Sequence, residues 1–393
     1  MSDRRLFMVS RPIVQFMAGV ASVCLWTLMG CLCMAGSAMA DNDLLSLPAP
    51  QVPQNRIAAS VLMDVVNTGP RLVAVGEGGL IALSEDGGIT WTQAGVPTST
   101  TLTAVYFPTA SQGWAVGHDG VILHSADGGK SWTKQIDGNT VNRMMLSQIE
   151  AITEQKRTLL KTVTDQQGED LSAELEDLEY FLKDIRAAVQ EGPGRPFLDV
   201  WFKDELKGVA VGSFGMIFRT VDGGATWRSM LDRIDNHEGY HYYGITLAGS
   251  LFLACEGGLL FRSNDDGWTW ERLESPLEGS FFGIIGDQRG AFVIAFGLGG
   301  IAYRSADLGV FWEAVDAPRS GSLSGACRLS NGTIVITATT GALLQSTDGG
   351  MTFNPLSHQF PGCLAAAEVS SGDLVVAGAS GLVRIRLNDE TGK

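Results

Sequence analysis

The sequence predicts an all-β protein: a seven-bladed β-propeller with an inserted antiparallel helical hairpin. Three observations predict it. A short motif recurs about every 42 residues, a glycine-rich pattern accompanies each copy, and one interval between copies is about 53 residues longer than the others. The chain has 393 residues, of which 18% are charged and 49 are glycines. This composition excludes a disordered chain and suits a fold of short strands and tight turns.

The first 40 residues have the order of a secretory signal peptide. Arginines within residues 4–11 precede an apolar run over 13–34, and Ala38-Met-Ala40 ends the segment. We therefore predict cleavage after Ala40 and a periplasmic or otherwise exported protein. The apolar run exceeds the usual length of about 7–15 residues, so an uncleaved membrane anchor is the alternative. A twin-arginine signal and a lipoprotein-type site at Cys31 are two further alternatives.

The charge of the chain excludes one class of partner. The formal net charge is -15 with an isoelectric point near 4.7. Residues 1–40 contain three arginines and one aspartate, so the mature chain carries -17. Binding to nucleic-acid phosphates needs an excess of Lys and Arg. We therefore expect no nucleic-acid partner.

Three cysteines remain after the signal peptide, at Cys255, Cys327 and Cys363. An odd number cannot pair completely within one chain. One disulfide with one free thiol, or three buried thiols, are both open. Each cysteine lies in an apolar, strand-like run, which favours a core role over a catalytic one.

An eight-residue box, S-x-D-G-G-x-T-W, occurs in six copies of varying completeness. The copies begin 41, 95, 43, 42 and 41 residues apart, starting from Ser84. The Ser and Asp side chains are expected to bond to the local backbone, the glycines to supply positive φ, and the aromatic residue to pack between neighbouring sheets. We therefore predict structural turns without metal-binding or catalytic roles. The residues with this role are Asp86, Trp91, Asp127, Trp132, Asp222, Trp227, Asp265, Trp270, Asp307, Trp312 and Asp348.

A second pattern precedes most boxes: an apolar run ends in Gly-x-x-Gly, and another apolar run follows. A seventh copy, Leu374–Ile385, falls 40 residues after the sixth, where the box itself is lost. The pattern predicts four short strands in each unit. A sheet this small leaves both of its apolar faces exposed, so the sheets must pack face to face around a ring. The seventh unit has only three strands. We predict that the extended stretch Pro48–Ile57 supplies its missing outer strand and closes the ring.

The long interval between Trp132 and Trp227 has a different character. Apolar residues at helical spacing predict one helix over 141–164 and a second over 170–190, separated by Asp165–Gly168 and closed by Gly192-Pro-Gly194. The apolar positions form an a/d stripe on each helix. The prediction is an antiparallel coiled-coil hairpin at residues 141–191, about 30 Å long at 1.5 Å per residue, inserted between the second and third blades of a propeller that spans 41–393.

The string Val211-Gly-Ser-Phe-Gly-Met-Ile-Phe-Arg-Thr-Val-Asp-Gly-Gly-Ala-Thr-Trp227 combines both patterns. It resembles the photosystem II stability/assembly factor family of Asp-box (BNR-repeat) propellers. The resemblance covers residues 61 to about 387 apart from the hairpin. It implies a non-catalytic, lumenal or periplasmic propeller without a cofactor that assists assembly of an integral membrane complex.

The resemblance also implies that arginines of the repeat contact the membrane subunit. The arginine before the box Ser or Thr is present at Arg219, Arg262 and Arg304; the other repeats carry Leu83, His124, Gln345 and Ile385 there. Local pairing with the box is the alternative role. Relatives in non-photosynthetic bacteria look like accessory proteins of resistance-nodulation-division exporters. The implied partner is therefore an envelope membrane complex of photosystem or exporter type, bound by a monomer.

One face of the predicted ring collects the remaining candidates. Turns between the second and third strands of a blade share a face with the links to the next blade, whereas the boxes lie on the opposite face. We expect this face to bind the partner. Its candidate residues are Glu77, His118, Asp119, Glu256, His237, Tyr240, His241 and Tyr242.

Three alternatives accompany this interpretation. The loop His237–Tyr243 is a candidate platform for a small ligand, although Tyr242 and Tyr243 can instead begin a strand and pack inward. A metal site at His237 and His241 lacks a third ligand of fixed spacing. A sialidase-like glycosidase would need an arginine triad and a catalytic Tyr, Glu and Asp. No Gly-x-Ser-x-Gly or phosphate-loop motif is present in the sequence.

Overall fold

The computed structural model describes residues 44–163, 166–369 and 372–387. The predicted signal peptide lies outside the described residues. Within them the chain forms seven antiparallel sheets, six with four strands and one with three. Each sheet uses strands that are consecutive in the sequence, as the repeat predicts.

The strands are short. The first sheet contains β1 (Leu62–Asn67), β2 (Leu72–Gly76), β3 (Ile81–Ser84) and β4 (Thr92–Gln93). The second contains β5 (Leu102–Tyr106), β6 (Gly113–Gly117), β7 (Ile122–Ser125) and β8 (Thr133–Ile136). The third contains β9 (Phe197–Phe202), β10 (Gly208–Gly212), β11 (Ile217–Thr220) and β12 (Arg228–Ser229). The fourth contains β13 (Tyr242–Ala248), β14 (Ser250–Cys255), β15 (Leu260–Ser263) and β16 (Glu271–Arg272).

The last three sheets repeat the plan. The fifth contains β17 (Phe281–Gly286), β18 (Val293–Gly297), β19 (Ala302–Ser305) and β20 (Glu313–Ala314). The sixth contains β21 (Leu323–Arg328), β22 (Ile334–Ala338), β23 (Ala342–Ser346) and β24 (Asn354–Gln359). The seventh contains β25 (Cys363–Glu368), β26 (Leu374–Gly378) and β27 (Gly381–Ile385). Short 3-10 turns are η1 (Glu77–Gly79), η2 (His118–Gly120), η3 (Leu231–Arg233), η4 (Glu256–Gly258) and η5 (Leu298–Gly300).

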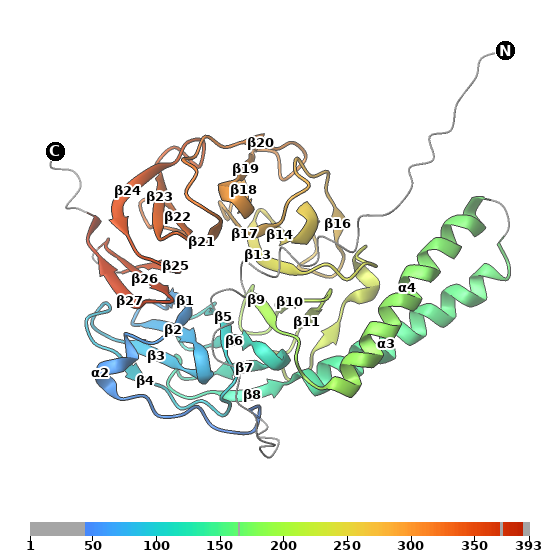
Figure 1. The fold of residues 1–393 in the computed structure, drawn as a ribbon, viewed down its shortest axis with the longest axis horizontal. Helices are drawn as coiled ribbons and strands as arrows, with labels where there is room; N and C mark the ends of the chain where they lie inside the picture. The colour runs from blue at the N-terminus through green and yellow to red at the C-terminus, as the bar shows by residue number, and fades with distance from the viewer. Residues whose placement is uncertain (1–43, 164–165, 370–371, 388–393) are drawn as a thin grey trace, which may run out of the picture. The chain divides into compact units, whose positions relative to one another are not determined.

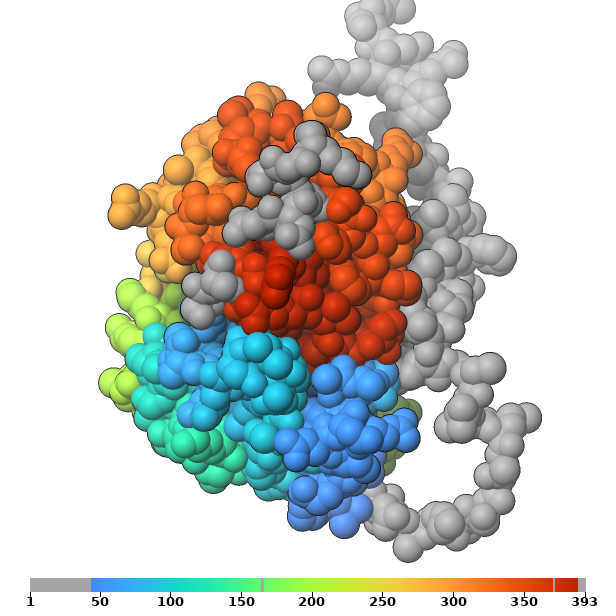
Figure 2. Space-filling model, turned by 90° about the vertical axis from the view of Figure 1, so that its left-hand side faces the viewer, coloured from blue at the N-terminus to red at the C-terminus, as the bar shows by residue number. Residues whose placement is uncertain are grey.

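The sheets close into a ring through their first strands. Each first strand contacts the first strand of the next sheet, from β1 to β5 and onward to β25, and β25 contacts β1 again. Figure 1 shows this circular arrangement, and in Figure 2 the red C-terminal segment lies beside the blue N-terminal one. The apolar core is divided accordingly into clusters that each fill the space between neighbouring sheets. The propeller arrangement of antiparallel four-stranded sheets is thus present.

The predicted outer strand at Pro48–Ile57 is wrong. The Gln93 side chain donates to the Pro50 carbonyl oxygen (2.9 Å) and accepts from the Val52 N–H (2.8 Å). This segment therefore lies along β4 of the first sheet, and its end forms a short helix, α2 (Gln54–Ile57). Prolines at 48, 50 and 53 have no N–H and cannot donate to a strand ladder. The Leu382 N–H of β27 donates instead to the Ala58 carbonyl, at 2.7 Å.

The boxes form tight turns between the third and fourth strands. In the first box, Asp86 accepts hydrogen bonds from the Ser84 hydroxyl (2.8 Å) and from the Thr90 hydroxyl (2.6 Å) and N–H (2.9 Å). The bonds from Thr90 are the largest cause that lowers the pKa of Asp86 to about 2. Trp91 is 5% exposed and packs with residues of the first and seventh sheets. The local bonding explains why this motif recurs with the sheet.

Two helices occupy the long interval, α3 (Gly138–Leu160) and α4 (Gln166–Glu191). We call residues 138–191 the helical insert. α3 begins three residues before the predicted Val141 because the Asp137 side chain caps it, accepting from the Thr140 N–H. α4 begins within the predicted loop, and residues 164 and 165 lie outside the described residues. Ion pairs Glu150–Arg186 (2.8 Å) and Arg157–Glu179 (2.7 Å) show that the helices run in opposite directions.

Cys255, Cys327 and Cys363, the cysteines within the described residues, are all free thiols. Cys255 and Cys363 are buried, and Cys327 is partly buried. Burial raises the pKa of Cys327 and of Cys363 to about 12 and that of Cys255 well above its usual value. Of the two open interpretations, the described structure matches three thiols without a disulfide.

Side chains on the innermost strands tie neighbouring sheets together. Asp64 of β1 accepts from the Val105 N–H of β5 at 2.9 Å, and Asp199 of β9 accepts from the Ile245 N–H of β13 at 2.8 Å. Both residues are partly buried. Burial is the largest cause that raises the pKa of Asp64 to about 6 and that of Asp199 to about 7.

These shifts give a testable pH dependence. A folded-state pKa above the unfolded value means that the carboxyl contributes stability below about pH 4, and that this contribution is lost as the pH rises through about 6 to 7. We expect Asp199→Asn to flatten the fall in unfolding free energy between about pH 4 and pH 7, measured by denaturant unfolding. Asp64→Asn should flatten mainly the lower part of that range. Wild-type slopes in both variants would contradict the assignment.

A candidate binding face around the helical insert

The insert is anchored to the ring by a shared apolar core. Met145 and Ile149 of α3 and Phe181 and Ile185 of α4 are at most 5% exposed, and they pack with ring residues including Phe218. Figure 1 shows both helices projecting from the ring beyond this base. The base of the insert therefore has a fixed position on the ring, and its outer part is presented to solvent.

The turn between the second and third strands of the second sheet contacts the start of α3. His118 and Asp119 lie in this turn, and a β-carbon added to Gly138 would lie 2.5 Å from the Asp119 carbonyl oxygen. Burial is the main cause that lowers the pKa of His118. Glu77, the equivalent position in the first sheet, is exposed. Its turn approaches Pro50 rather than the insert, so Glu77 is not brought to the other candidates.

A second group of candidates meets beside the insert. His241 Nδ1 lies 3.3 Å from Glu256 Oε2, and the Phe214 N–H donates to the same nitrogen at 3.2 Å. Burial is the main cause that lowers the pKa of His241, and the Glu256 charge opposes it. Tyr240 packs over the neighbouring turn, 3.7 Å from the position of a β-carbon on Gly257. The predicted convergence of these loops is therefore present for His241, Tyr240 and Glu256.

Sequence reasoning missed Arg195, which connects this group to α4. Its Nη2 donates to Asp184 Oδ2 at 2.6 Å, and its guanidinium carbon lies 4.4 Å from the centre of the Phe214 ring. Arg195 is 8% exposed. The only sequence signal is an arginine directly after Gly192-Pro-Gly194, where the chain re-enters the ring.

The prediction that Tyr242 lies on the binding face is wrong. Its side chain is fully buried between the third and fourth sheets, where its ring meets Phe261 at 6.2 Å between centroids. As the first residue of β13 it alternates inward, so it is a core residue and cannot contact a partner. His237 and His241 serve different neighbours: His237 Nε2 lies 3.4 Å from Asp235, and His241 faces Glu256. In the described part of the chain, no group of three or more His, Cys, Asp or Glu residues could hold a metal ion.

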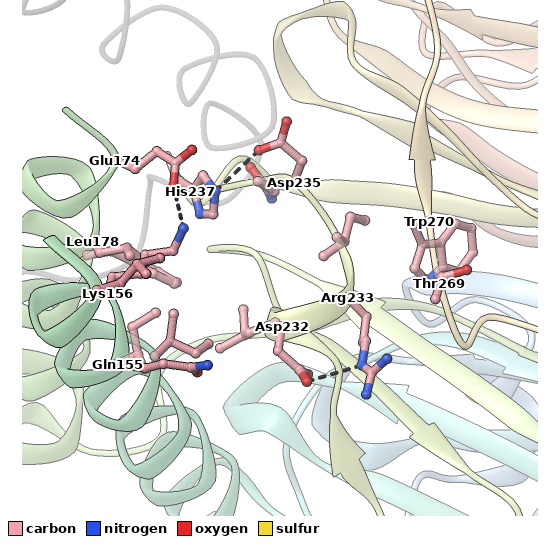
Figure 3. A pocket seen from close by; sticks show the side chains of 17 residues that line it. Gln155, Lys156, Glu174, Leu178, Asp232, Arg233, Asp235, His237, Thr269 and Trp270 are labelled. Atoms are coloured by element: carbon pink, nitrogen blue, oxygen red, sulfur yellow. Dashed lines mark hydrogen bonds and ion pairs between the residues drawn. The ribbon is translucent and has the colours of Figure 1, made fainter. Parts of the chain in front are cut away.

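A pocket lies between the insert and the loop that links the third and fourth sheets. We call it the insert groove; its volume is about 730 Å³. One wall consists of residues of α3 and α4, including Ile152, Leu159 and Leu178. The other wall is the segment Leu231–His237, and Thr269 and Trp270 complete the lining. Figure 3 shows Lys156 and Leu178 on the helical side and Asp232 and His237 on the loop side.

Polar groups in the groove are mostly paired with one another. Lys156 of α3 bonds to Glu174 of α4. Asp232 accepts from Gln148 at 2.6 Å and from Arg233 at 3.1 Å. The surfaces left for a ligand are therefore apolar side chains between charged rims.

The repeat arginines lie elsewhere. Arg219 donates to the Asp266 carbonyl (2.9 Å), Arg262 to the Leu308 carbonyl (2.7 Å) and Arg304 to the Gly349 carbonyl (2.9 Å). Each acceptor is the fourth residue of the next box, so these arginines join neighbouring sheets on the box side. They are not brought together with His241 and Glu256. Arg219 also lies 5.4 Å from the ring of Trp268, an exposed box residue that the sequence analysis did not single out.

Comparisons with known proteins bear on this architecture. A model of the family described as photosynthesis system II assembly factor YCF48 matches residues 52–166 and 187–359, well over half of the chain. The match omits residues 167–186, which lie within α4. The photosystem II assembly lipoprotein Ycf48 of Synechococcus sp. (strain CC9902) is 39% identical over 77 residues, 19% of this chain and 23% of that protein. The matched segment thus spans about a quarter of that relative.

Two solved structures share the fold. YCF48 bound to a D1 peptide is 17% identical, with a TM-score of 0.55 over 84% of this chain and 94% of that one. The WD40 β-propeller domain of Doa1 is 12% identical, with a TM-score of 0.57 over 88% of this chain and 97% of that one. At these identities the likeness establishes the propeller fold alone.

Proposed function

This chain belongs to the photosynthesis system II assembly factor YCF48 family, and we propose that it is a non-enzymatic assembly factor that binds an extracytoplasmic segment of an integral membrane complex. The client is of photosystem type, as the names of the relatives suggest. An exporter client has no support among the relatives compared. The solved YCF48 with a D1 peptide provides a precedent for peptide binding by this fold.

The seven sheets act as seven blades of one ring, and the helical insert is an antiparallel coiled-coil hairpin. Export is part of the proposal, because the related Ycf48 is named a lipoprotein and residues 1–40 have the order of a signal peptide. None of the helices that the structure describes has the length and apolar character needed to cross a membrane.

The observation that carries the proposal is the attachment of the insert to the ring through a shared apolar core. The base of the insert contributes to this core, while its outer part and the linking loop enclose the groove. A fixed arm beside an apolar recess suits capture of a protein segment. Propeller folds serve both binding and catalysis, but the box aspartates are committed to local hydrogen bonds, as Asp86 is to Ser84 and Thr90.

Shortening the insert tests this function. We expect a variant with residues 158–177 replaced by a short Gly/Ser loop to remain folded, because Met145, Ile149, Phe181 and Ile185 are retained. It should lose capture of the membrane complex, measured by crosslinking in the native envelope and mass spectrometry. Undiminished capture would overturn the proposal.

A matched variant on the box side is the control. Arg304→Gln removes a tie to the sixth sheet's box without touching the insert, so capture should stay at the wild-type level. Loss of capture in Arg304→Gln alone, with a wild-type melting temperature, would assign client binding to the box side instead. Enzymatic turnover of a glycoside by the wild-type protein would contradict the non-enzymatic part.

A further inference from the structure

We propose that the insert groove binds an amphipathic helix of the client, with its apolar face toward α3 and α4 and basic residues along its edges. The inference rests on the proposed function and adds the chemistry of the bound segment. Three features of the groove carry it: the spacing of its apolar side chains, the pairing of its polar groups, and the charge of its rim.

The helical wall presents apolar side chains at helical spacing. On α3, Ile149, Ile152 and Leu159 line the groove, and on α4 Leu178 and Phe181 do so. Leu159 is 50% exposed, and Ile152 is partly exposed. Neighbouring members of these sets are three or seven residues apart, spacings that place side chains on one helix face. Ile149, Leu178 and Phe181 are already at most 5% exposed, so a third helix that packs its ridges here covers mainly Leu159 and Ile152.

Hydrogen bonding favours a helix over an extended segment. The lining segments are two helices, whose backbones are internally bonded, and a loop. In that loop the Arg233 carbonyl already accepts from the Trp270 N–H at 3.0 Å, and the Ile234 carbonyl accepts from the Asn236 N–H at 3.1 Å. An extended peptide would lose bonds to water without finding backbone partners here. A helix satisfies its own backbone groups and needs only apolar contact.

The rim of the groove is acidic. The charged residues that line the groove are Glu174, Asp232 and Asp235, together with Lys156 and Arg233. Beyond the lining, α4 as a whole (Gln166–Glu191) carries eight acidic residues and two basic ones. Asp170 and Asp177 are exposed on α4, three or four residues from the groove residue Glu174. On the loop side, the Asp235 side chain is 65% exposed, with His237 Nε2 at 3.4 Å. This rim attracts Lys and Arg on the edges of a bound helix and disfavours an acidic one.

The test is fluorescence anisotropy with the full mature chain. The probe is a labelled synthetic helical peptide of about five turns, with Leu on one face and Lys on both edges; the control peptide has Glu in place of Lys. We expect the basic peptide to bind and the acidic one to bind at least about tenfold more weakly. Equal binding of both peptides, or binding of neither, would overturn the inference.

Variants locate the peptide. Leu159→Gln should weaken binding about tenfold because it removes a central apolar contact, and Asp177→Lys about threefold, more at low salt. Tyr180→Ser is the matched control, because Tyr180 is 77% exposed on α4 and does not line the groove. Wild-type binding by Leu159→Gln would place the peptide elsewhere.

A photo-crosslinking residue at position 159 separates this inference from the proposed function. Crosslinks from position 159, but not from position 180, to a basic amphipathic segment of the client would support the groove. Capture that depends on the insert without crosslinks from 159 would leave the proposed function standing and refute the groove assignment. Specific peptide binding in the groove with no capture in the envelope would refute the proposed function alone.

Discussion

Replacing Phe181 with alanine should lower the free energy of unfolding by about 3–5 kcal/mol, the usual cost of a large aromatic truncation in a core. Phe181 is 5% exposed and belongs to the cluster that contains Val141 of α3 and Phe218 of the ring. Two ring segments approach its side chain closely: β-carbons added to Gly239 and Gly215 would lie 3.2 Å and 3.7 Å from its ring atoms. Glycine has no side chain that could fill the cavity left by the missing phenyl ring, and a shift of its backbone into that cavity would distort the loop.

The measurement is denaturant unfolding of the mature protein. Tyr180→Ala is the control, since the neighbouring Tyr180 is 77% exposed and its loss should cost less than about 0.5 kcal/mol. A loss below about 1 kcal/mol in Phe181→Ala would mean that the insert is not part of the ring's core. In that case the anchored arm on which the proposed function depends would be absent.

The sheets could be predicted from the sequence because their signals are local. Each box combines a Ser, an Asp and two glycines within a few residues, and the hydrogen bonds that shape the turn lie within the box, as between Ser84 and Asp86. The apolar runs that flank such a turn are neighbours in the sequence, so they pair with each other as adjacent strands. The repetition of this unit led to the ring without any knowledge of long-range contacts.

The packing of the insert on the ring was not predictable in the same way. The a/d stripe predicted one apolar face on each helix, directed at the other helix; on the second helix this face includes Leu178 and Leu182. α4 also buries Phe181 against the ring, so it has two buried faces and adjacent buried positions. A heptad pattern assumes that the helix packs against one partner, so it predicts that a residue beside the a/d positions, such as Phe181, faces solvent. Arg195 was missed for the same reason, because its partner Asp184 comes from a different element.

The prediction of an outer strand for the seventh sheet failed because counting strands does not consider hydrogen-bond donors. The stretch at Pro48–Ile57 was extended and unassigned, and the seventh unit was one strand short. The three prolines prevent a continuous ladder, and the Gln93 side chain offers both a donor and an acceptor to this segment. The sequence indicated that this segment was not part of any repeat. Which sheet edge it lies along depends on the backbone N–H groups that it has available for hydrogen bonds.

Trp312→Ala is the second change with a large expected effect, about 3–5 kcal/mol in unfolding free energy. Trp312 is 7% exposed, packs with Phe252 and Phe281 of the fourth and fifth sheets, and donates its indole N–H to the Gly309 carbonyl at 3.1 Å. The sixth box carries Phe353 at the equivalent position, 3% exposed.

That natural difference supplies the control, because a phenyl ring already fills one inter-sheet space of this type without the indole hydrogen bond. Trp312→Phe should therefore cost only about 1–2 kcal/mol, from the lost hydrogen bond and the smaller ring. If phenylalanine were as harmful as alanine, the indole N–H would be the essential part of the box, and Phe353 would need a different explanation. If alanine cost little, the box aromatic would not join the sheets, and the turn bonds of Ser305 and Asp307 alone would account for the motif.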